Sequence, residues 1–486
     1  GALGAACYDR AIERMMLQLK SFGYNCIRCS HNPYSDSFAR IADRVGILVV
    51  DELTDKWSNN DYWGGRQPFT HIWHKLITEW IKRDRNRPSI ILWSLGNELQ
   101  IREGWAGFEG TNDWGITTYN IFNQLVKRWD HTRLTTVAMF PARAGAITRH
   151  DKEFNDYLVP PELACATEVA SFNYQSDKYD VYLKYRPDLI LFQSEAETSN
   201  LLQPYYNMDR KRTVGMAYWG SVEYWGESNK WPKKGWNYSF FGHTMRPYPQ
   251  AYLIKSAFMP EIPEVHIGVV DAAGAESVSW NDVVVGRMAL NECWNHTPGS
   301  RQSLFAFTNA HSVELLVNGQ SMGVQENDTT QANRRNMIYW KDVPYGNGGS
   351  VVAIARDKSG KEVARHHIET AGKAVALRIE AETPADWKAD GMDLQYINVT
   401  AIDKKGRPVW DYNEPLTLQM EGVARLVALD NGDHYTDELF HGITSKRMYQ
   451  GRMQIILRSD QKAGNVMVKV FSAGLKGTLR LKTINE

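Results

Sequence analysis

The first 260 residues of the chain alternate between helix-like and strand-like patterns, and this alternation limits the fold more than any other feature. Apolar residues recur with helical spacing over residues 8–22, 35–45, 71–82 and 117–129. Strand-like segments lie between and after them, at residues 25–31, 46–52, 89–98, 135–141, 169–174, 189–195 and 214–220. Such alternation is typical of parallel strands joined by helical crossovers.

The strand-like segments predict a (β/α)₈ TIM barrel that lacks its first strand. A complete barrel needs eight strands and about 250 residues, whereas this region supplies seven candidates and begins with a helix-like segment. We therefore expect a missing N-terminal segment of the same protein to be a partner of this chain. A gap leaves two strand edges unpaired, so we expect the 486 residues to be inactive alone.

Beyond residue 260 the pattern changes to short alternating strands separated by turns such as VNGQ and DKSGK. The proline-rich segment at residues 246–265 reads as a last barrel helix that runs into a linker. Short strands at this spacing predict immunoglobulin-like β-sandwiches. We expect a barrel domain at residues 1–262, one sandwich at 263–373 and a second at 374–486.

Composition argues against nucleic-acid and membrane partners. Lys plus Arg and Asp plus Glu both total 56, so no net charge favours a polyanion. No apolar run approaches the roughly 20 residues that a bilayer span needs. The five cysteines are too scattered for a disulfide framework, and Cys26 and Cys29 point to opposite faces of one predicted strand. We interpret them as buried thiols.

One predicted strand ends in a carboxylate. Residues 90–95 read IILWSL, as a strand buried on both faces requires, and Asn97 and Glu98 follow. Parallel barrels place their chemistry at the carboxyl ends of the strands. Glu98 is therefore a candidate proton donor or acceptor, and the alternative is a Glu that caps a following helix.

Several segments resemble glycoside hydrolase family 2, and the similarity covers most of the chain. The segments similar to its barrel strands are FGYNCIRCSHNPYSDSFARIADRVGILVVDE, RDRNRPSIILWSLGNE, LILFQSEAE and GMAYWGSVEYW. LLVNGQSMG and LVALDNGD resemble the sandwich domains that follow the barrel in bacterial members, many of them β-galactosidases. Members generally carry a sugar-binding jelly roll and an immunoglobulin-like domain before the barrel, and this chain shows neither.

The resemblance implies glycoside hydrolysis with retention, which uses two carboxyl groups about 5 to 5.5 Å apart. It assigns Glu98 as the acid/base and Glu195 as the nucleophile. Glu197 is a rival nucleophile, because residues two apart on a strand share a side. Glu195 is favoured since the family nucleophile commonly follows a small residue, here Ser194.

The resemblance also implies a set of sugar-contacting residues. They are Asn97, Arg28, His31, Tyr174, Trp219 and Asp51. Asn97 matches the residue that binds the sugar 2-hydroxyl, Tyr174 matches a hydrogen-bond donor to the nucleophile, and Trp219 matches the floor of the subsite.

Other interpretations of this set stay open. Asn97 is alternatively a turn residue, and His31 a core imidazole. The Asp51-Glu52 pair is expected to face Arg28 or the sugar, and Arg28 alternatively forms a structural ion pair with one of them.

Two departures from the family pattern bear on substrate and metal. Family β-glucuronidases hold the substrate carboxylate with Asn-x-Lys before a Gly, whereas this chain has Pro at the Asn position of residues 232–235, PKKG. Residues 99–102, LQIR, offer no ligand suited to a hard cation beside Glu98. We predict no required metal and no cofactor.

We expect an exo-acting β-galactosidase that acts on an oligosaccharide or polysaccharide, in the periplasm or secreted by family habit. Within the family, the alternatives are a β-glucuronidase or a β-mannosidase. A non-catalytic carbohydrate-binding protein is an alternative from another class. The sandwiches fit it, as do flat aromatic rings in predicted loops, at Trp57, Trp63, Trp105, Trp114, Trp225, Trp231 and Trp236.

Overall fold

The computed structural model of the chain describes residues 1–5, 8–57, 69–99, 115–140, 160–228, 230–271, 276–280 and 283–485. The chain divides into two compact units. We call Leu19–Trp219 the barrel unit, and Gly1–Gln18 with Gly220–Glu486 the sandwich unit. Among the described residues, no helix has both the length and the apolar character needed to cross a membrane.

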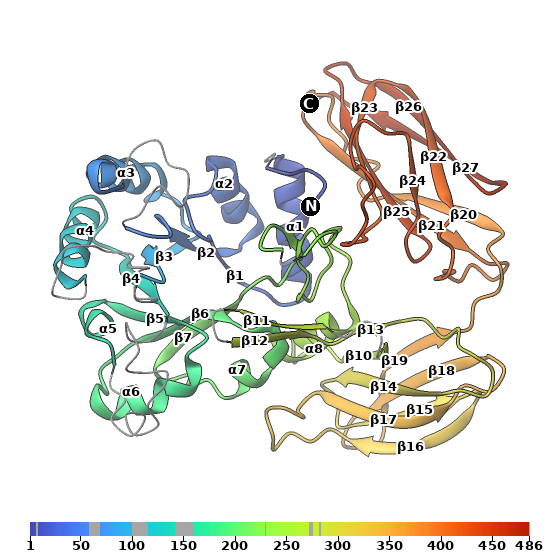
Figure 1. Ribbon diagram of the computed structural model, residues 1–486, viewed down its shortest axis with the longest axis horizontal. Helices are drawn as coiled ribbons and strands as arrows, with labels where there is room; N and C mark the ends of the chain where they lie inside the picture. Colours follow the sequence, from blue (N-terminus) through green and yellow to red (C-terminus); the bar gives the residue numbers. More distant parts are fainter. Residues whose placement is uncertain are drawn as a thin grey trace. The chain divides into compact units, whose positions relative to one another are not determined.

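The barrel unit contains one sheet of parallel strands, joined in the order of the sequence (Figure 1). The strands are β1 (Cys26–Arg28), β2 (Leu48–Glu52), β3 (Ile90–Asn97), β4 (Leu134–Met139), β5 (Val169–Asn173), β6 (Leu191–Ala196) and β7 (Thr213–Tyr218). β1 and β7 also approach each other, so the sheet curls into a nearly closed barrel. The predicted barrel is thus confirmed, and each described strand overlaps a predicted segment, although β4, β6 and β7 each extend one residue beyond theirs.

Helices connect successive strands and lie outside the sheet (Figure 1). They are α2 (Asp36–Val45), α3 (Phe69–Asp84), α4 (Ile116–Trp129), α5 (Glu162–Ala166), α6 (Tyr179–Tyr185) and α7 (Gln203–Tyr206), while α1 (Asp9–Ser21) precedes β1. Local sequence sets their ends. Ser35 caps α2 by accepting from the Phe38 N–H at 3.2 Å, and Gly46 ends it with φ 78°, which glycine adopts at little cost.

Two antiparallel sandwiches make up most of the sandwich unit, as the sequence predicts (Figure 1). The first pairs sheet β13–β10–β14–β17 with sheet β16–β15–β18–β19, and the second pairs β20–β21–β25–β23 with β24–β22–β26–β27. Each has its own buried core, drawn from alternate residues of its strands. Short elements precede the first sandwich: β8 (Tyr224–Trp225), β9 (Gly235–Trp236) and α8 (Pro249–Phe258).

The strand bounds follow the chain. In the first sandwich they are β10 (Val265–Val270), β13 (Leu290–Asn291), β14 (Arg301–Thr308), β15 (Ser312–Val317), β16 (Gln320–Glu326), β17 (Met337–Pro344), β18 (Ser350–Arg356) and β19 (Glu362–Glu369), with the pair β11 (Glu276–Trp280) and β12 (Val283–Arg287) between β10 and β13. In the second they are β20 (Ala376–Ala381), β21 (Leu394–Ile402), β22 (Pro415–Gly422), β23 (Ala424–Asp430), β24 (Ser445–Arg447), β25 (Arg452–Ser459), β26 (Gly464–Ser472) and β27 (Leu475–Thr483). The predicted boundaries at 262 and 373 fall between elements, although residues 220–262 group with the sandwiches. The domain limits therefore stay a prediction.

Candidate active site

Polar side chains gather at the carboxyl ends of the barrel strands, where a parallel barrel carries its chemistry. They are Arg28 on β1, Glu52 on β2, Asn97 on β3 with Glu98 directly after it, Asn173 on β5 and Glu195 on β6. All of them are buried. Buried charges are stable only when they are paired and hydrogen-bonded, so their partners define what the site can do.

Arg28 forms ion pairs with two of the acidic groups of this site, Glu52 and Glu195. Its Nη1 donates to Glu195 Oε1 at 2.8 Å, and its Nη2 donates to Glu52 Oε2 at 2.7 Å. Nη2 also donates to Asn97 Oδ1 at 2.9 Å. The guanidinium therefore holds the predicted nucleophile and the end of β3 in fixed positions. The alternative interpretation of Arg28, an ion pair with Glu52, is seen here, and its contact with a sugar stays a prediction.

Asn173 extends this network to Glu98. Its Nδ2 donates both to Asn97 Oδ1 and to Glu98 Oε1, at 3.0 Å each. Its own oxygen accepts from Ser194 Oγ at 2.8 Å, which fixes the orientation of the amide. A continuous chain of hydrogen bonds thus runs from Glu195 through Arg28, Asn97 and Asn173 to Glu98.

Sequence reasoning missed Asn173. It named Tyr174, the next residue, although strand alternation offers a signal: Ser171 and Asn173 are polar positions of β5 that share one side.

The two carboxyl groups differ in their surroundings. Burial raises the pKa of Glu98 to about 7, and the negative charge of Glu195 adds to this effect. Glu195 instead has the Arg28 guanidinium at 2.8 Å. A carboxyl whose burial favours its protonated form, together with a second carboxyl paired with a guanidinium, is an arrangement suited to general acid catalysis.

His31 and Trp219 stack at the same end of the barrel. Their ring centroids lie 5.3 Å apart with an interplanar angle of 4°. His31 Nδ1 lies 2.6 Å from Glu52 Oε1, and its Nε2 lies 3.8 Å from Glu195 Oε1. Burial lowers the pKa of His31, but the bond to Glu52 and its charge outweigh that effect and raise the pKa overall. His31 is thus part of the charged network.

Comparison with known proteins now identifies the family. The family model described as "Glycosyl hydrolases family 2, TIM barrel domain" matches residues 3–212, and "Glycoside hydrolase family 2 C-terminal domain 5" matches residues 377–479. The chain belongs to glycoside hydrolase family 2. A domain of unknown function matches residues 299–364 of this family 2 chain.

Relatives of the chain carry two kinds of name. "Beta-galactosidase BoGH2A" of Bacteroides ovatus is 27% identical over 98% of the chain and 59% of its own length. A protein of Formosa agariphila named "Putative beta-glucuronidase" is 44% identical over the whole chain and 47% of its own length. The chain thus spans roughly half to three fifths of the length of these curated relatives.

Solved structures agree on the fold. The crystal structure of a family 2 member from Bacteroides cellulosilyticus matches with a TM-score of 0.85 and 27% identity, over the whole chain and 61% of that protein. A β-glucuronidase of family 2, at 18% identity and a TM-score of 0.71, shows the same fold.

Glu197 does not join the charged network of this family 2 site. Its Oε2 accepts from Ser199 Oγ at 3.2 Å and from Asn200 Nδ2 at 3.3 Å, within a short turn after β6. β6 ends at Ala196, so the strand periodicity that would place Glu197 beside Glu195 stops before it. Of the two residues, Glu195 is the one that pairs with Arg28, and the assignment of the nucleophile stays a prediction.

Asp51 is the predicted sugar contact that the structure does not bring to the site. Its Oδ2 accepts from Trp80 Nε1 on α3 at 2.6 Å, so the side chain faces the helical layer. Glu52, the next residue of β2, points to the opposite side and pairs with Arg28. The expectation for Asp51 is therefore corrected, and Glu52 is the member of the pair that contacts Arg28.

Changing Asp51 to Asn is expected to flatten the pH dependence of the free energy of unfolding. Burial, together with the charge of Asp84, raises the pKa of Asp51 to about 8. The folded state therefore binds this proton more tightly than the unfolded chain, and the resulting stability is present below the unfolded pKa of about 3.9 and is lost as pH rises through about 8. An Asn amide resembles the protonated carboxyl and avoids this loss.

Urea unfolding at pH 5 and pH 9 measures the effect of D51N. Between pH 5 and pH 9, the free energy of unfolding of the original chain should fall by more than that of D51N. The difference should be on the order of a few kcal/mol. The exposed Asp36 provides a control, because D36N leaves the buried pair with Asp84 intact. Parallel pH curves for D51N and the original chain would contradict the assigned burial effect.

Tyr174 lies beside the nucleophile strand through its backbone. Its N–H donates to the Glu195 carbonyl at 2.8 Å, and its ring packs edge-on against Phe140 with centroids 5.9 Å apart. The hydroxyl contact with the Glu195 carboxylate stays a prediction.

The tryptophans that suggested a carbohydrate cleft have different settings. Trp57 is buried and donates from Nε1 to the Leu95 carbonyl at 2.8 Å, so it supports β3 and does not present a free face. In the sandwich unit, Trp236 is buried and Trp231 is exposed. Three others lie outside the described residues: Trp63, Trp105 and Trp114.

The lysines of the PKKG segment have partners within the sandwich unit. Lys233 is buried and donates from Nζ to the Tyr238 hydroxyl at 3.1 Å. Lys234 donates to the Thr436 carbonyl, and its ammonium lies over the Trp231 ring. Both ammonium groups thus have partners within their own unit. This argues against either lysine binding the carboxylate of a uronide substrate.

Proposed function

We propose that the protein carrying this chain is a retaining β-glycosidase that works through a covalent glycosyl-enzyme. One observation carries the proposal: the buried hydrogen-bond chain that links Glu195 to Glu98 and gives one an Arg partner and the other a pKa of about 7. A purely structural ion pair would not need a second buried carboxyl whose burial keeps its proton.

In the first step, a Glu195 carboxylate oxygen attacks the anomeric carbon, while Glu98 gives its proton to the glycosidic oxygen and the aglycone leaves. In the second step, Glu98, now ionised, removes a proton from water, and the water oxygen displaces Glu195 from the anomeric carbon. Two inversions leave the sugar with its original configuration. Glu98 ends protonated and Glu195 ionised, as at the start.

The other residues position these two groups. Arg28 keeps Glu195 in place, and the Arg28 and Asn173 bonds to Asn97 Oδ1 fix the Asn97 amide. An amide held in this way is suited to the sugar 2-hydroxyl, a contact that strengthens as positive charge develops on the ring. The stacked pair of His31 and Trp219 offers a flat face for the sugar ring.

For the sugar itself we propose a terminal β-galactoside. The name of the Bacteroides ovatus relative supports galactose, as does the engagement of Lys233 and Lys234. A β-glucuronide is the second candidate, favoured by the name of the relative that is 44% identical.

A set of 4-nitrophenyl β-glycosides tests both levels of the proposal. We expect the highest kcat/KM on the galactoside, and proton NMR of the first product should show the β-anomer. A preference for the glucuronide would change the proposed substrate to a β-glucuronide and would not affect the proposed mechanism. An α-anomer as first product would contradict retention, and glycan binding without sugar release would favour the non-catalytic alternative.

A further inference from the structure

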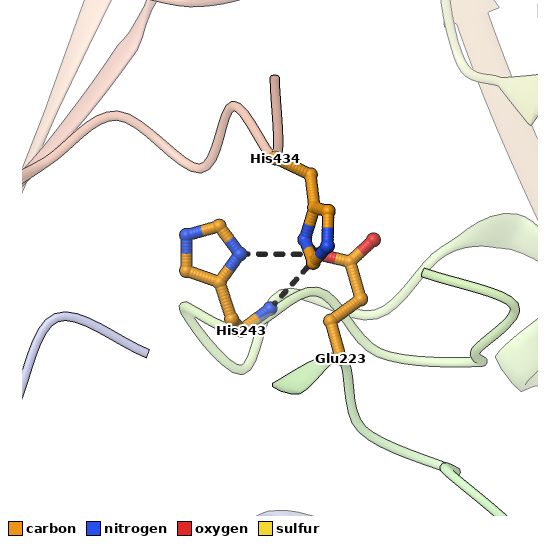
Figure 2. A group of neighbouring side chains, drawn as sticks. All are labelled: Glu223, His243 and His434. Carbon is orange, nitrogen blue, oxygen red and sulfur yellow. Dashed lines mark hydrogen bonds and ion pairs between the residues drawn. The ribbon is translucent and has the colours of Figure 1, made fainter. Parts of the chain in front are cut away.

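A second group of ionisable side chains belongs to the sandwich unit and includes none of the residues of the proposed reaction. Glu223 and His243 come from the segment between β7 and α8, and His434 comes from the loop after β23 (Figure 2). Figure 2 shows the three side chains pointing toward one another. One ligand atom from each lies within 4.8 Å of the others.

The hydrogen-bonding capacity of the His434 ring is not satisfied among the described residues. The residue is 4% exposed, and neither of its ring nitrogens makes a hydrogen bond to any residue that the structure describes. Its Nδ1 lies 3.5 Å from Glu223 Oε2. A buried imidazole without hydrogen-bond partners costs stability, and this one points at a carboxylate that a second imidazole also approaches.

The spacing of these atoms matches a coordination sphere. Ligands bound to Zn²⁺ at about 2.0–2.1 Å in a tetrahedron lie about 3.3 Å from each other. Glu223 Oε2 lies 3.1 Å from His243 Nδ1 and 3.5 Å from His434 Nδ1. We propose that Glu223, His243 and His434 bind a divalent transition-metal ion of the Zn²⁺ class.

The surrounding groups support this arrangement. His243 Nε2 lies 3.0 Å from Asp430 Oδ1, so Asp430 can hold the tautomer that leaves Nδ1 unprotonated toward the metal. The Tyr248 hydroxyl donates to Glu223 Oε1 at 2.7 Å, and the His243 backbone N–H donates to Oε2 at 3.2 Å. Both bonds orient the carboxylate, and Oε2 keeps a second lone pair for the ion. Metal-bound histidines and carboxylates are commonly oriented by outer hydrogen bonds of these two kinds.

A cavity of about 550 Å³ gives the ion a route to the site, since Glu223, Asp430 and His434 line it. Three protein ligands leave the fourth tetrahedral position for water or another small ligand from this cavity. The ion would tie the segment after β7 to the C-terminal sandwich. We therefore expect it to stabilise the sandwich unit.

The structure contains a second cluster of two histidines and one glutamate, formed by His266, Glu292 and His366. It differs from the first because its histidine at the position of His434 has a hydrogen-bond partner. Its imidazole rings stack with centroids 3.9 Å apart, and His366 Nδ1 accepts the Ile267 N–H at 3.0 Å. That nitrogen already has a partner, so this cluster provides a matched control site.

The test uses the complete chain, stripped with EDTA and then dialysed against Zn²⁺. We expect about one Zn²⁺ per chain by elemental analysis and a Tm rise of roughly 5–10 °C at a hundredfold excess over Kd. H434N should lose the bound Zn²⁺ and the Tm rise, while H366N should keep both. D430N should weaken Zn²⁺ binding by about 10- to 100-fold, because it removes only the outer partner of His243.

Co²⁺ provides a check that does not depend on any variant folding. The Co²⁺-loaded chain should show the intense visible absorption of a tetrahedral nitrogen and oxygen site. The proposal is overturned if the original chain binds no Zn²⁺, if Co²⁺ gives only the weak spectrum of the hydrated ion, or if H366N and not H434N loses the metal. In the first two cases the cluster is a set of ion pairs around a protonated His243.

Discussion

Changing Glu195 to Gln is expected to lower kcat on aryl β-glycosides by about 10⁴-fold or more. A neutral amide cannot form the glycosyl ester, so the covalent route is closed. The fold should be kept, because Arg28 still has three bonds to Glu52 and one to Asn97. Steady-state kinetics on 4-nitrophenyl glycosides provide the measurement, in a preparation of a longer polypeptide that carries this chain, since we expect the 486 residues to be inactive alone.

Glu197 supplies the matched control. It is two residues away, carries the same functional group and hydrogen-bonds only locally in the bonds described above. E197Q should change kcat by a small factor. A mechanism-based 2-deoxy-2-fluoro glycoside should label Glu195 in the original enzyme, as read by peptide mass spectrometry. A label on Glu197, or an E197Q variant that is as impaired as E195Q, would reverse the assignment.

Changing Glu98 to Gln should lower kcat/KM by about 10²- to 10⁴-fold on substrates with poor leaving groups. The loss on a dinitrophenyl glycoside should be much smaller, since dinitrophenolate departs without protonation. Unequal losses of this kind separate a missing proton donor from a general loss of structure. Equal losses on both substrates would contradict the acid role of Glu98.

The pH dependence of kcat/KM provides a second test of the acid role of Glu98. Burial and the charge of Glu195 raise the pKa of Glu98 to about 7. The first step needs the protonated form, so kcat/KM should fall as pH rises through about 7. E98Q carries no titrating proton at this position, and its remaining activity should not show this decline. A decline that persists in E98Q would assign the group to another residue.

The barrel and the strand ends that carry Glu98 and Glu195 could be predicted because they depend on local patterns, whereas the paired roles of the two carboxylates came from the resemblance to glycoside hydrolase family 2. Apolar residues recur about every 3.6 residues in a helix and every 2 residues in a strand, so both can be read from the sequence. The carboxyl ends of parallel strands all lie at one end of a barrel. Glu98 and Glu195 each stand at the end of such a strand. Strand order places both ends at one face of the barrel, and the structure links the two carboxylates through Arg28, Asn97 and Asn173.

The partners of these residues could not be predicted in the same way. Asp51 and Glu52 look equivalent in the sequence, yet one faces Trp80 and the other Arg28. The difference depends on which side of β2 faces the helices, and buried residues on both sides of a parallel strand hide that choice. Asn173 was missed for a related reason, because a polar residue in a strand shows no partner until its neighbours are placed.

The sequence by itself determined that the chain forms parallel strands and then sandwiches, and which carboxylates end which strands. Only the tertiary structure decided that Arg28 lies between Glu52 and Glu195, that Asn173 reaches Glu98, and that His243 and the distant His434 approach Glu223. Periodicity acts over a few neighbouring residues and is visible in a string of letters. Pairing of charges depends on distances of about 3 Å, and these exist only after strands and loops far apart in the sequence have packed together.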